Sequence, residues 1–420
     1  MRRKRVLFLV MTLASMFIVA PIDVVSADQT EKLIEILKEK GIVTTEEAEA
    51  LEKEVESDAA SDAAWTDKVE VGYKKGAYIK TTDDRYSLKF RVRTQGLFSY
   101  EDPEDGETKS TFRVRRARLL LGGNVFYPWM KYGTQVTLEG GSASLRDAWI
   151  EAAYFDYAAP RIGQYKVPYS REFLTSAFSL ELIDRSLANA VFSLQRDIGL
   201  QFSGQFFQDK FSYAAGIFNG SGANQSNQNN DFMYVGRIVY TPFGSYPYSQ
   251  AALDTPDRMK LAIGLAGASL PSLDPGERDR LAGRLGDTSI VPVTSDVYQL
   301  TADIAFKYQN FSFEGGYHFR NIDPEEPTPF GEQDANGFYL QGGYFLVPKK
   351  FELAARYSWV DPDNPNTTEN NEETEYTGGL SYYLSGHSLK LQANYSLFTT
   401  ETPDDDLDDH VVQCLMTLAF

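Results

Sequence analysis

From about residue 69 onward, apolar and polar side chains alternate along the chain with a period of two. In residues 388–397 every odd position is apolar or aromatic and every even position is polar. The same alternation recurs in residues 86–93, 311–314 and 351–357. It predicts strands with one apolar and one polar face. Runs of about 10 to 13 residues exceed the usual strand of about 5 or 6 and match strands that cross a membrane at a tilt.

The connections between these segments alternate in length. Tight breaks fall near residues 127–128, 156–157, 208–209, 309–310, 348–349 and 386–387. Long polar stretches lie near 101–110, 167–195, 220–231, 270–295, 322–335, 361–374 and 400–409. Outer-membrane barrels join their strands by short periplasmic turns and longer outer loops in this way. The pattern therefore predicts an all-β fold, a transmembrane antiparallel β-barrel.

About sixteen strands fit the alternation, an even number that brings both ends of the barrel to one side of the membrane. They cover residues 85–100, 111–125, 131–140, 144–155, 160–166, 196–207, 210–219, 231–242, 258–269, 296–308, 311–321, 336–347, 350–360, 374–385, 387–399 and 410–420. The eighth and ninth strands are joined across Tyr240 to Asp257, which is unusually long for a periplasmic turn. A barrel of this size has a lumen wide enough to hold water.

The first 27 residues have the three parts of a secretory signal peptide. A basic start at residues 1–5 is followed by an apolar run to Ala20 and by Val25, Ser26 and Ala27 before the cleavage point. An uncleaved membrane helix is the alternative, but the run is shorter than the roughly 20 residues that cross a bilayer. We expect cleavage after Ala27 and export to the outer membrane of a Gram-negative cell. Cys414 is the only cysteine, so no intrachain disulfide supports the exported fold.

Residues 28–57 follow a helical period. Leu33, Ile34 and Leu37 share one face, and Thr44 and Glu47 fit a capping box that opens a second helix. We predict a short periplasmic helical hairpin at 28–57, a small polar linker at 58–68 and the barrel at 69–420. The hairpin could serve trimerisation or face the cell wall, or it could be a spacer, and the sequence leaves these alternatives open.

Composition and motifs argue against nucleic-acid binding and catalysis. The formal net charge is −18, whereas a nucleic-acid backbone binds basic surfaces. No Gly-x-Ser-x-Gly motif is present, and His318 shares one strand face with Ser312 and Glu314 at a spacing of two, which cannot converge as a triad. We assign no catalytic residue, cofactor or metal site. A hydrolase built on a barrel is the weakest alternative, below a structural tether or adhesin that the barrel anchors.

The same alternation predicts which charged side chains face the lumen. Lys89, Arg91 and Arg93 alternate with apolar residues in the first strand, and Arg237 and Arg356 phase inward on later strands. A guanidinium on the lipid side near the midplane costs about 2 to 4 kcal/mol, which favours the inward assignment.

The second strand is harder to phase because it carries arginines at consecutive positions. Arg113 and Arg115 face the lumen if Phe112 and Val114 face lipid. Arg116 and Arg118 then fall on the opposite phase and need a bulge or a rim position.

Acidic residues share the predicted lumen face, and basic residues also occur near the long 167–195 stretch. The inward acidic positions are Asp147 and Glu151, together with Glu139, Asp197, Asp303, Glu314 and Glu352. Lys166, Arg171 and Arg185 lie in or beside the stretch, along with Glu172, Glu181 and Asp184. Rings of mixed sign predict weak ion selectivity. The alternative is that these charges form structural pairs across the barrel wall.

Four segments in order resemble the family of phosphate-selective porins O and P. They are residues 112–119 (FRVRRARL), 144–151 (SLRDAWIE), 161–169 (RIGQYKVPY) and 184–190 (DRSLANA). The resemblance covers residues 112 to about 244 and extends to the helical segment before the barrel. The C-terminal half is similar to the family only in its general pattern. Family members best known for phosphate carry arginine ladders and a few lysines at the constriction. This sequence departs from that pattern because carboxylates accompany the arginines.

The resemblance implies a homotrimeric outer-membrane porin of sixteen strands, with residues 167–195 folded into the pore. Such a porin passes small hydrophilic solutes passively, inorganic anions such as phosphate among them. We expect contact with outer-membrane lipid and lipopolysaccharide. The alternating last strand ends in Phe420, which is similar to the signal that the barrel assembly machinery reads.

Overall fold

The computed structural model describes residues 44, 53, 68–227, 229–275, 293–328, 331–361, 372–402 and 406–420. The chain divides into two compact units, Met1–Glu70 and Val71–Phe420, and all that follows concerns the second. The predicted signal segment at 1–27 lies outside the described residues, as do the hairpin at 28–57 and the linker at 58–68 except for three single positions. No helix in the described part of the chain has the length and apolar character of a membrane span.

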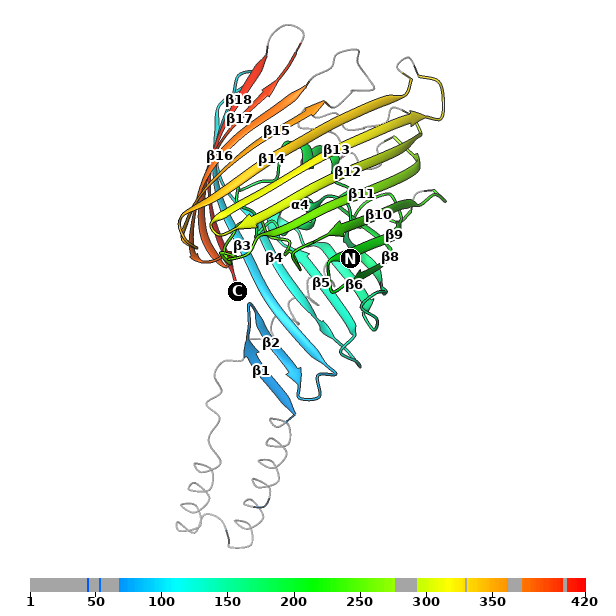
Figure 1. The fold of residues 1–420 in the computed structure, drawn as a ribbon, viewed down its shortest axis with the longest axis vertical. Helices are drawn as coiled ribbons and strands as arrows, with labels where there is room; N and C mark the ends of the chain where they lie inside the picture. Colours follow the sequence, from blue (N-terminus) through cyan, green and yellow to red (C-terminus); the bar gives the residue numbers. More distant parts are fainter. Residues whose placement is uncertain are drawn as a thin grey trace. The chain divides into compact units, whose positions relative to one another are not determined.

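Sixteen antiparallel strands form a closed barrel, because the last strand pairs with the first (Figure 1). The strands are β3 (Ser87–Pro103), β4 (Lys109–Asn124), β5 (Met130–Thr137), β6 (Ser144–Ala152), β7 (Ala159–Lys166), β8 (Arg196–Phe206), β9 (Phe211–Phe218), β10 (Met233–Tyr240), β11 (Lys260–Leu273), β12 (Ser295–Tyr308), β13 (Phe311–Pro324), β14 (Gln333–Val347), β15 (Phe351–Asp361), β16 (Glu373–Ser385), β17 (Leu389–Thr400) and β18 (Leu407–Ala419). This confirms the predicted barrel of about sixteen strands.

Two further strands precede the barrel. β1 (Val69–Tyr73) pairs with β2 (Ala77–Thr81), and β2 pairs in turn with the start of β3. β18 takes over as the partner of β3 directly after β2, because Phe420 and Val92 exchange backbone hydrogen bonds of 2.8 and 2.9 Å. β3 is therefore paired along its whole length on this side, first by β2 and then by β18.

Side-chain exposure follows the period of two along the strands. In β17 the polar Lys390, Gln392 and Asn394 are buried inside the barrel, whereas Leu391 and Tyr395 are about half exposed on the outer face. Outward side chains such as these are mostly apolar, as contact with lipid requires. Inward side chains are mostly polar. The structure thus confirms the predicted phase of this strand.

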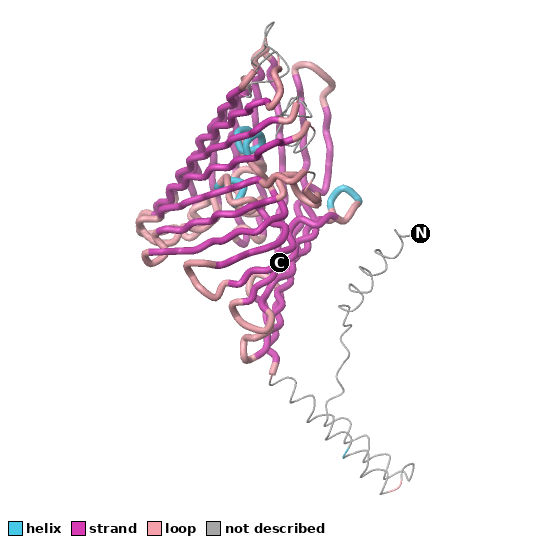
Figure 2. The backbone as a smooth tube through the Cα atoms, turned by 90° about the vertical axis from the view of Figure 1, so that its right-hand side faces the viewer, coloured by secondary structure: helices cyan, strands magenta, loops and turns pink. Residues whose placement is uncertain are grey.

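The tight turns fall where the sequence breaks predict them, at 207–210, 309–310 and 348–350. Two of these turn residues, Gln309 and Lys349, have positive φ values of 51° and 61°, as tight hairpin turns require. Two short helices, α4 (Arg171–Leu174) and α5 (Leu187–Phe192), follow β7, and a 3-10 turn, η1 (Glu139–Gly141), follows β5. Figure 2 shows short helical segments among the strands of the barrel and a further one to the side of them.

Replacing Leu340 by arginine should destabilise the barrel through its lipid face. Leu340 lies mid-strand in β14 and is 48% exposed on the outer side. We expect the free energy of unfolding in lipid bilayers to fall by about 2 to 4 kcal/mol, because a guanidinium at midplane depth is poorly solvated.

Leu346 supplies the matched control, since it is 53% exposed on the same outer face but lies at the strand end. Leu346→Arg should cost only about 0 to 1 kcal/mol because the side chain reaches the interface. Equal costs for the two variants would contradict the membrane placement of β14.

Candidate functional site

The connection between β7 and β8, residues 167–195, packs against the inside of the barrel. Ser170 and Ser186 begin its two helices, and each hydroxyl accepts a hydrogen bond from a backbone N–H three residues later. The backbone N–H of Leu187 donates to Glu375 (2.8 Å) and that of Ala188 to Ser358 (3.1 Å), both on the inner barrel wall. We call this segment the inner loop.

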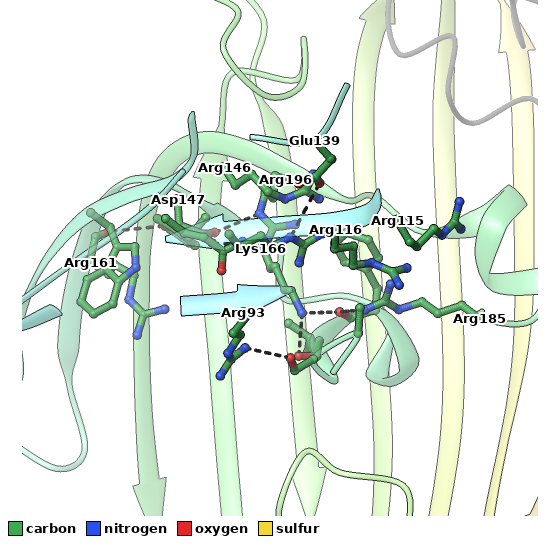
Figure 3. Close-up of a pocket in the computed structure, with 18 residues that line it drawn as sticks. Arg93, Arg115, Arg116, Glu139, Arg146, Asp147, Arg161, Lys166, Arg185 and Arg196 are labelled. Carbon is green, nitrogen blue, oxygen red and sulfur yellow. Dashed lines mark hydrogen bonds and ion pairs between the residues drawn. The ribbon is translucent and has the colours of Figure 1, made fainter. Parts of the chain in front are cut away.

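One cavity of about 550 Å³ lies between the inner loop and the wall made by β3 to β8 (Figure 3). Nine of its eighteen lining residues are arginine or lysine, and two are acidic. The basic residues are Arg93, Arg115, Arg116, Arg118, Arg146, Arg161, Lys166, Arg185 and Arg196, and the acidic ones are Glu139 and Asp147. We call this space the arginine cavity.

Two β-bulges place arginines in this cavity. In β4 the register passes from Arg116 opposite Gln95 to Val114 opposite Gly96, which leaves Arg115 as the extra residue. In β6 it passes from Asp147 opposite Gln135 to Leu145 opposite Val136, which leaves Arg146 as the extra residue. A bulge inserts one residue and re-aims the side chains around it. Two consecutive charged residues therefore reach the lumen on each strand.

Carboxylates partner several of the cavity arginines. Asp184 of the inner loop lies 2.5 Å from Arg115 and 3.5 Å from Arg116. Asp147 accepts from Arg196 through both oxygens, at 2.9 and 3.2 Å. Such pairs order the guanidinium groups, and bidentate contacts are the best defined.

Two further pairs lie along the wall, one of them between β4 and the turn η1. Glu151 accepts from Arg161 Nε at 2.8 Å, and Glu139 lies 3.9 Å from Arg118. The guanidinium of Arg161 also lies over the ring of Trp149, 4.5 Å from its centroid. Cation–π contact of this kind fixes the orientation of an arginine that faces water.

Arg93 and Arg146 have no carboxylate within ion-pair distance among the described residues. Arg93 donates to Ser176 Oγ at 3.3 Å and lies over the ring of Phe178. Both side chains line the arginine cavity. They are the cavity cations most available to a passing anion.

Lys166 and Arg185 hold the end of α4 in the inner loop through hydrogen bonds to backbone carbonyls. Lys166 Nζ donates to the backbone carbonyls of Phe173 (2.6 Å), Leu174 (2.9 Å) and Thr175 (3.1 Å) at the end of α4. Arg185 donates to the carbonyls of Glu172 (2.9 Å) and Thr175 (2.7 Å). These two cations satisfy helix-end carbonyls that otherwise lack partners.

The electrostatics of the inner loop depend on burial and on the arginines. Burial opposes the charged form of Asp184, but Arg115 and Arg116 outweigh it and hold the pKa of this carboxyl below its ordinary value. Burial raises the pKa of Glu172 to about 7 despite its approach to Arg356. Asp184, which pairs with two of the cavity arginines, is thus the more acidic of these two inner-loop carboxyl groups.

The opposite side of the lumen is closed. Along β10 to β17 most of the inward charged residues are nearly inaccessible, for example Lys307 (0%), Glu352 (0%) and Glu314 (4%). Arg237 lies 2.7 Å from Asp303, and Arg356 lies 2.5 Å from Glu375. Charges of both signs therefore pair inside the wall on this side, whereas the accessible surface of the arginine cavity is mainly basic.

The twelve predicted pore-lining residues fall into three groups according to what surrounds them in the structure. Five line the arginine cavity and a sixth pairs at its wall: Arg93, Arg115, Lys166, Arg185, Asp147 and Glu151. Three lie on β3 or β4 outside its lining: Lys89, Arg91 and Arg113. Three are buried in ion pairs beyond it: Arg171, Arg237 and Arg356.

Five basic residues of the cavity were missing from the predicted set: Arg116, Arg118, Arg146, Arg161 and Arg196. The phase conflict at Arg116 and Arg118 was the available signal, since it required a bulge or a rim position and a bulge is present. Arg146 and Arg161 lie within the segments that carry the family resemblance. No comparable signal marked Arg196.

The residues considered for a hydrolase, His318 and Ser312, contact different partners inside the barrel. His318 is 1% exposed and stacks on Phe192, with ring centroids 5.5 Å apart. The hydroxyl of Ser312 donates to Glu181 of the inner loop. Each of these side chains therefore packs the lumen interior.

The sequence and the fold match known proteins over most of the chain. The family model described as phosphate-selective porin O and P matches residues 88–420. An uncharacterized protein of Aquifex aeolicus (strain VF5) is 24% identical over 451 residues, which cover 94% of this chain and 95% of that protein.

Solved outer-membrane structures share the fold at low sequence identity. An anion-selective porin from Comamonas acidovorans is 13% identical with a TM-score of 0.55 over 79% of this chain and 99% of that chain. The outer membrane channel DcaP of Acinetobacter baumannii is 12% identical with a TM-score of 0.54 over 81% and 99%. OmpF of Salmonella typhi, in complex with daunomycin, is 13% identical with a TM-score of 0.55 over 84% and 100%.

Proposed function

The chain belongs to the phosphate-selective porin O and P family, and on that premise we propose that its passive outer-membrane channel prefers anions. The observation that carries the proposal is the arginine cavity, whose lining has nine basic and two acidic side chains, with two more carboxylates, Asp184 and Glu151, paired to its arginines from outside the lining. The acidic residues of the opposite wall are buried, several of them in ion pairs, and contribute little to the field in the water. An aqueous pore selects by the sign of accessible charge at its narrowest point.

The solutes that fit this site are small hydrophilic anions, phosphate among them. Guanidinium groups bind phosphate and carboxylate oxygens through paired N–H donors. The pairing of most cavity arginines with carboxylates lowers the net charge that one phosphate meets. We therefore propose a general preference for small anions over a site that holds phosphate alone.

We also propose the molecular setting in which the channel works. The chain is exported through a cleaved signal peptide at 1–27 and is not an enzyme. Its barrel contacts outer-membrane lipid and lipopolysaccharide, and Phe420 addresses it to the barrel assembly machinery. It works as a homotrimer, which agrees with the trimer form recorded for OmpT of Vibrio cholerae. Residues 28–57 form a periplasmic helical hairpin before the barrel.

Planar-bilayer recording tests the proposal with one preparation. In a potassium chloride gradient the purified protein should give stepwise currents with a reversal potential of the sign set by chloride. Replacing chloride by phosphate should retain measurable current, because the site accepts anions generally. Silence would indicate a plugged barrel that acts as a tether, and a cation-selective reversal potential would rule out the proposed preference.

A further inference from the structure

The connection between β10 and β11, residues 241–259, enters the barrel. It starts at the end that carries the tight turns, which outer-membrane barrels place in the periplasm. Six of its residues are buried, among them Tyr246 (8%), Gln250 (3%), Ala251 (1%) and Ala252 (0%). A turn that merely joins two strands would leave such residues in water.

The segment packs on the inner wall of the closed side of the lumen. Ala251 and Ala252 form an apolar cluster with Phe345 and Tyr383 of β14 and β16. Tyr246 joins a second cluster on β10 to β12. Ser249 Oγ accepts a hydrogen bond of 3.2 Å from Lys307 Nζ. The contacts span several strands, so the segment occupies lumen volume.

Gln250 connects this segment to the inner loop. Its backbone N–H donates to Ser179 O at 3.2 Å, and its side-chain oxygen accepts from the Glu181 N–H at 3.0 Å. Its side-chain nitrogen donates to Glu314 Oε1 of β13 at 3.2 Å. One buried amide therefore ties the segment, the inner loop and the barrel wall together.

Two tyrosines of the same segment hold the start of the inner loop. The guanidinium of Arg171 in α4 lies 4.6 Å from the ring centroid of Tyr246 and 5.0 Å from that of Tyr248. Arg171 also lies 3.6 Å from Glu314. Buried cation–π contacts of this kind stabilise by more than exposed ones because the cation has lost water.

We infer that residues 241–259 are a positioning element for ion selectivity: they support the inner loop from the periplasmic side and close the lumen along β11 to β16. Within the part of the barrel that the structure describes, this closure leaves the arginine cavity as the route for ions. The acidic side chains Glu181, Glu314 and Glu352 stay out of the ion path because this closure covers them. The inference rests on the proposed anion preference and deepens it.

Gln250→Glu is the sharpest test, because it places a carboxylate against Glu314 in the buried contact. We expect single-channel conductance to rise roughly twofold, since a second route along the acidic wall opens, and the anion-to-cation permeability ratio to fall. Lowering the pH from about 8 to about 5 should restore the parent values, because a protonated glutamate resembles glutamine at a site that raises its pKa.

Ser245→Glu is the matched control, since Ser245 is exposed in the same segment and the substitution adds the same charge. It should leave conductance and the permeability ratio unchanged. Heat-modifiable gel mobility verifies the barrel in each variant. If Gln250→Glu fails to fold, Gln250→Ala removes the side-chain contacts without adding charge, and it should raise conductance in the same direction without dependence on pH.

A folded Gln250 variant that conducts and selects like Ser245→Glu would overturn the inference. The outcome differs from failure of the proposed function, which appears in the unsubstituted protein as a cation-selective or silent channel. A channel that prefers anions but ignores Gln250 keeps the proposed function and loses only the positioning role.

Discussion

Replacing Arg93 and Arg146 together by glutamate should reverse the ion preference of the channel. Both side chains line the arginine cavity, and neither has a carboxylate within ion-pair distance in the described residues. Reversing one charge about 8 Å from a monovalent ion in water changes its energy by about 1 kcal/mol, or roughly fivefold. Two reversals should lower the anion-to-cation permeability ratio by more than about tenfold, which is measured from reversal potentials in a salt gradient.

Arg258→Glu serves as the control for that experiment. Arg258 is exposed near the start of β11, outside the lining of the arginine cavity. The permeability ratio should change little, because a distant exposed charge is screened by salt. A ratio that stays anion-selective after both cavity arginines are reversed would place the selectivity elsewhere in the barrel.

Asp303→Asn should be the most destabilising single change among the charged lumen residues. Asp303 lies 2.7 Å from Arg237, and both side chains are almost fully buried. The substitution leaves a buried guanidinium without its counter-charge, which costs about 3 to 5 kcal/mol. Arg237 also donates to the Tyr169 carbonyl at the start of the inner loop (2.6 Å), so the loop should loosen as well. Urea unfolding in lipid or detergent measures the loss.

An exposed ion pair provides the comparison. Asp254 lies 2.5 Å from Lys260, with side chains 45% and 29% exposed. Asp254→Asn should lower the free energy of unfolding by no more than about 1 kcal/mol, because water already solvates both charges. Similar losses at Asp254 and Asp303 would contradict the burial of the Arg237 pair.

The barrel wall was predictable because membrane contact imposes a strict period on the sequence. Each outward position meets lipid and each inward position meets polar groups. In a strand such as β17 the direction of every side chain can therefore be deduced from the sequence. The tight turns at 309–310 and 348–350 were equally visible as breaks in that period. Strand ends beside long loops were less exact, because polar loop residues continue the alternation without lipid contact. β11, for instance, runs to Leu273, four residues beyond the predicted end.

The site was only partly predictable, because the period says which way a side chain points and not what covers it. Arg93 and Arg356 share the inward phase, yet Arg93 lines the arginine cavity and Arg356 is buried against Glu375. The difference is made by the inner loop and residues 241–259, whose paths depend on contacts between distant parts of the chain. Arg116 and Arg118 fell on the opposite phase for another reason, since the bulge in β4 adds a residue that strict alternation cannot place.

β2 and β18 pair with consecutive parts of the same edge of β3, and this arrangement limits how the barrel can close during folding. Ala77 of β2 pairs with Phe90, and the chain end at Phe420 pairs with Val92. The closing strand cannot slide toward the start of β3, because β2 already occupies that edge. A shift of the β18 register by two residues toward the start of β3 would keep every side chain on its proper face, but β2 blocks it sterically. β2 thus fixes the register in which β18 pairs with β3, and no free strand edge remains there for another chain to join.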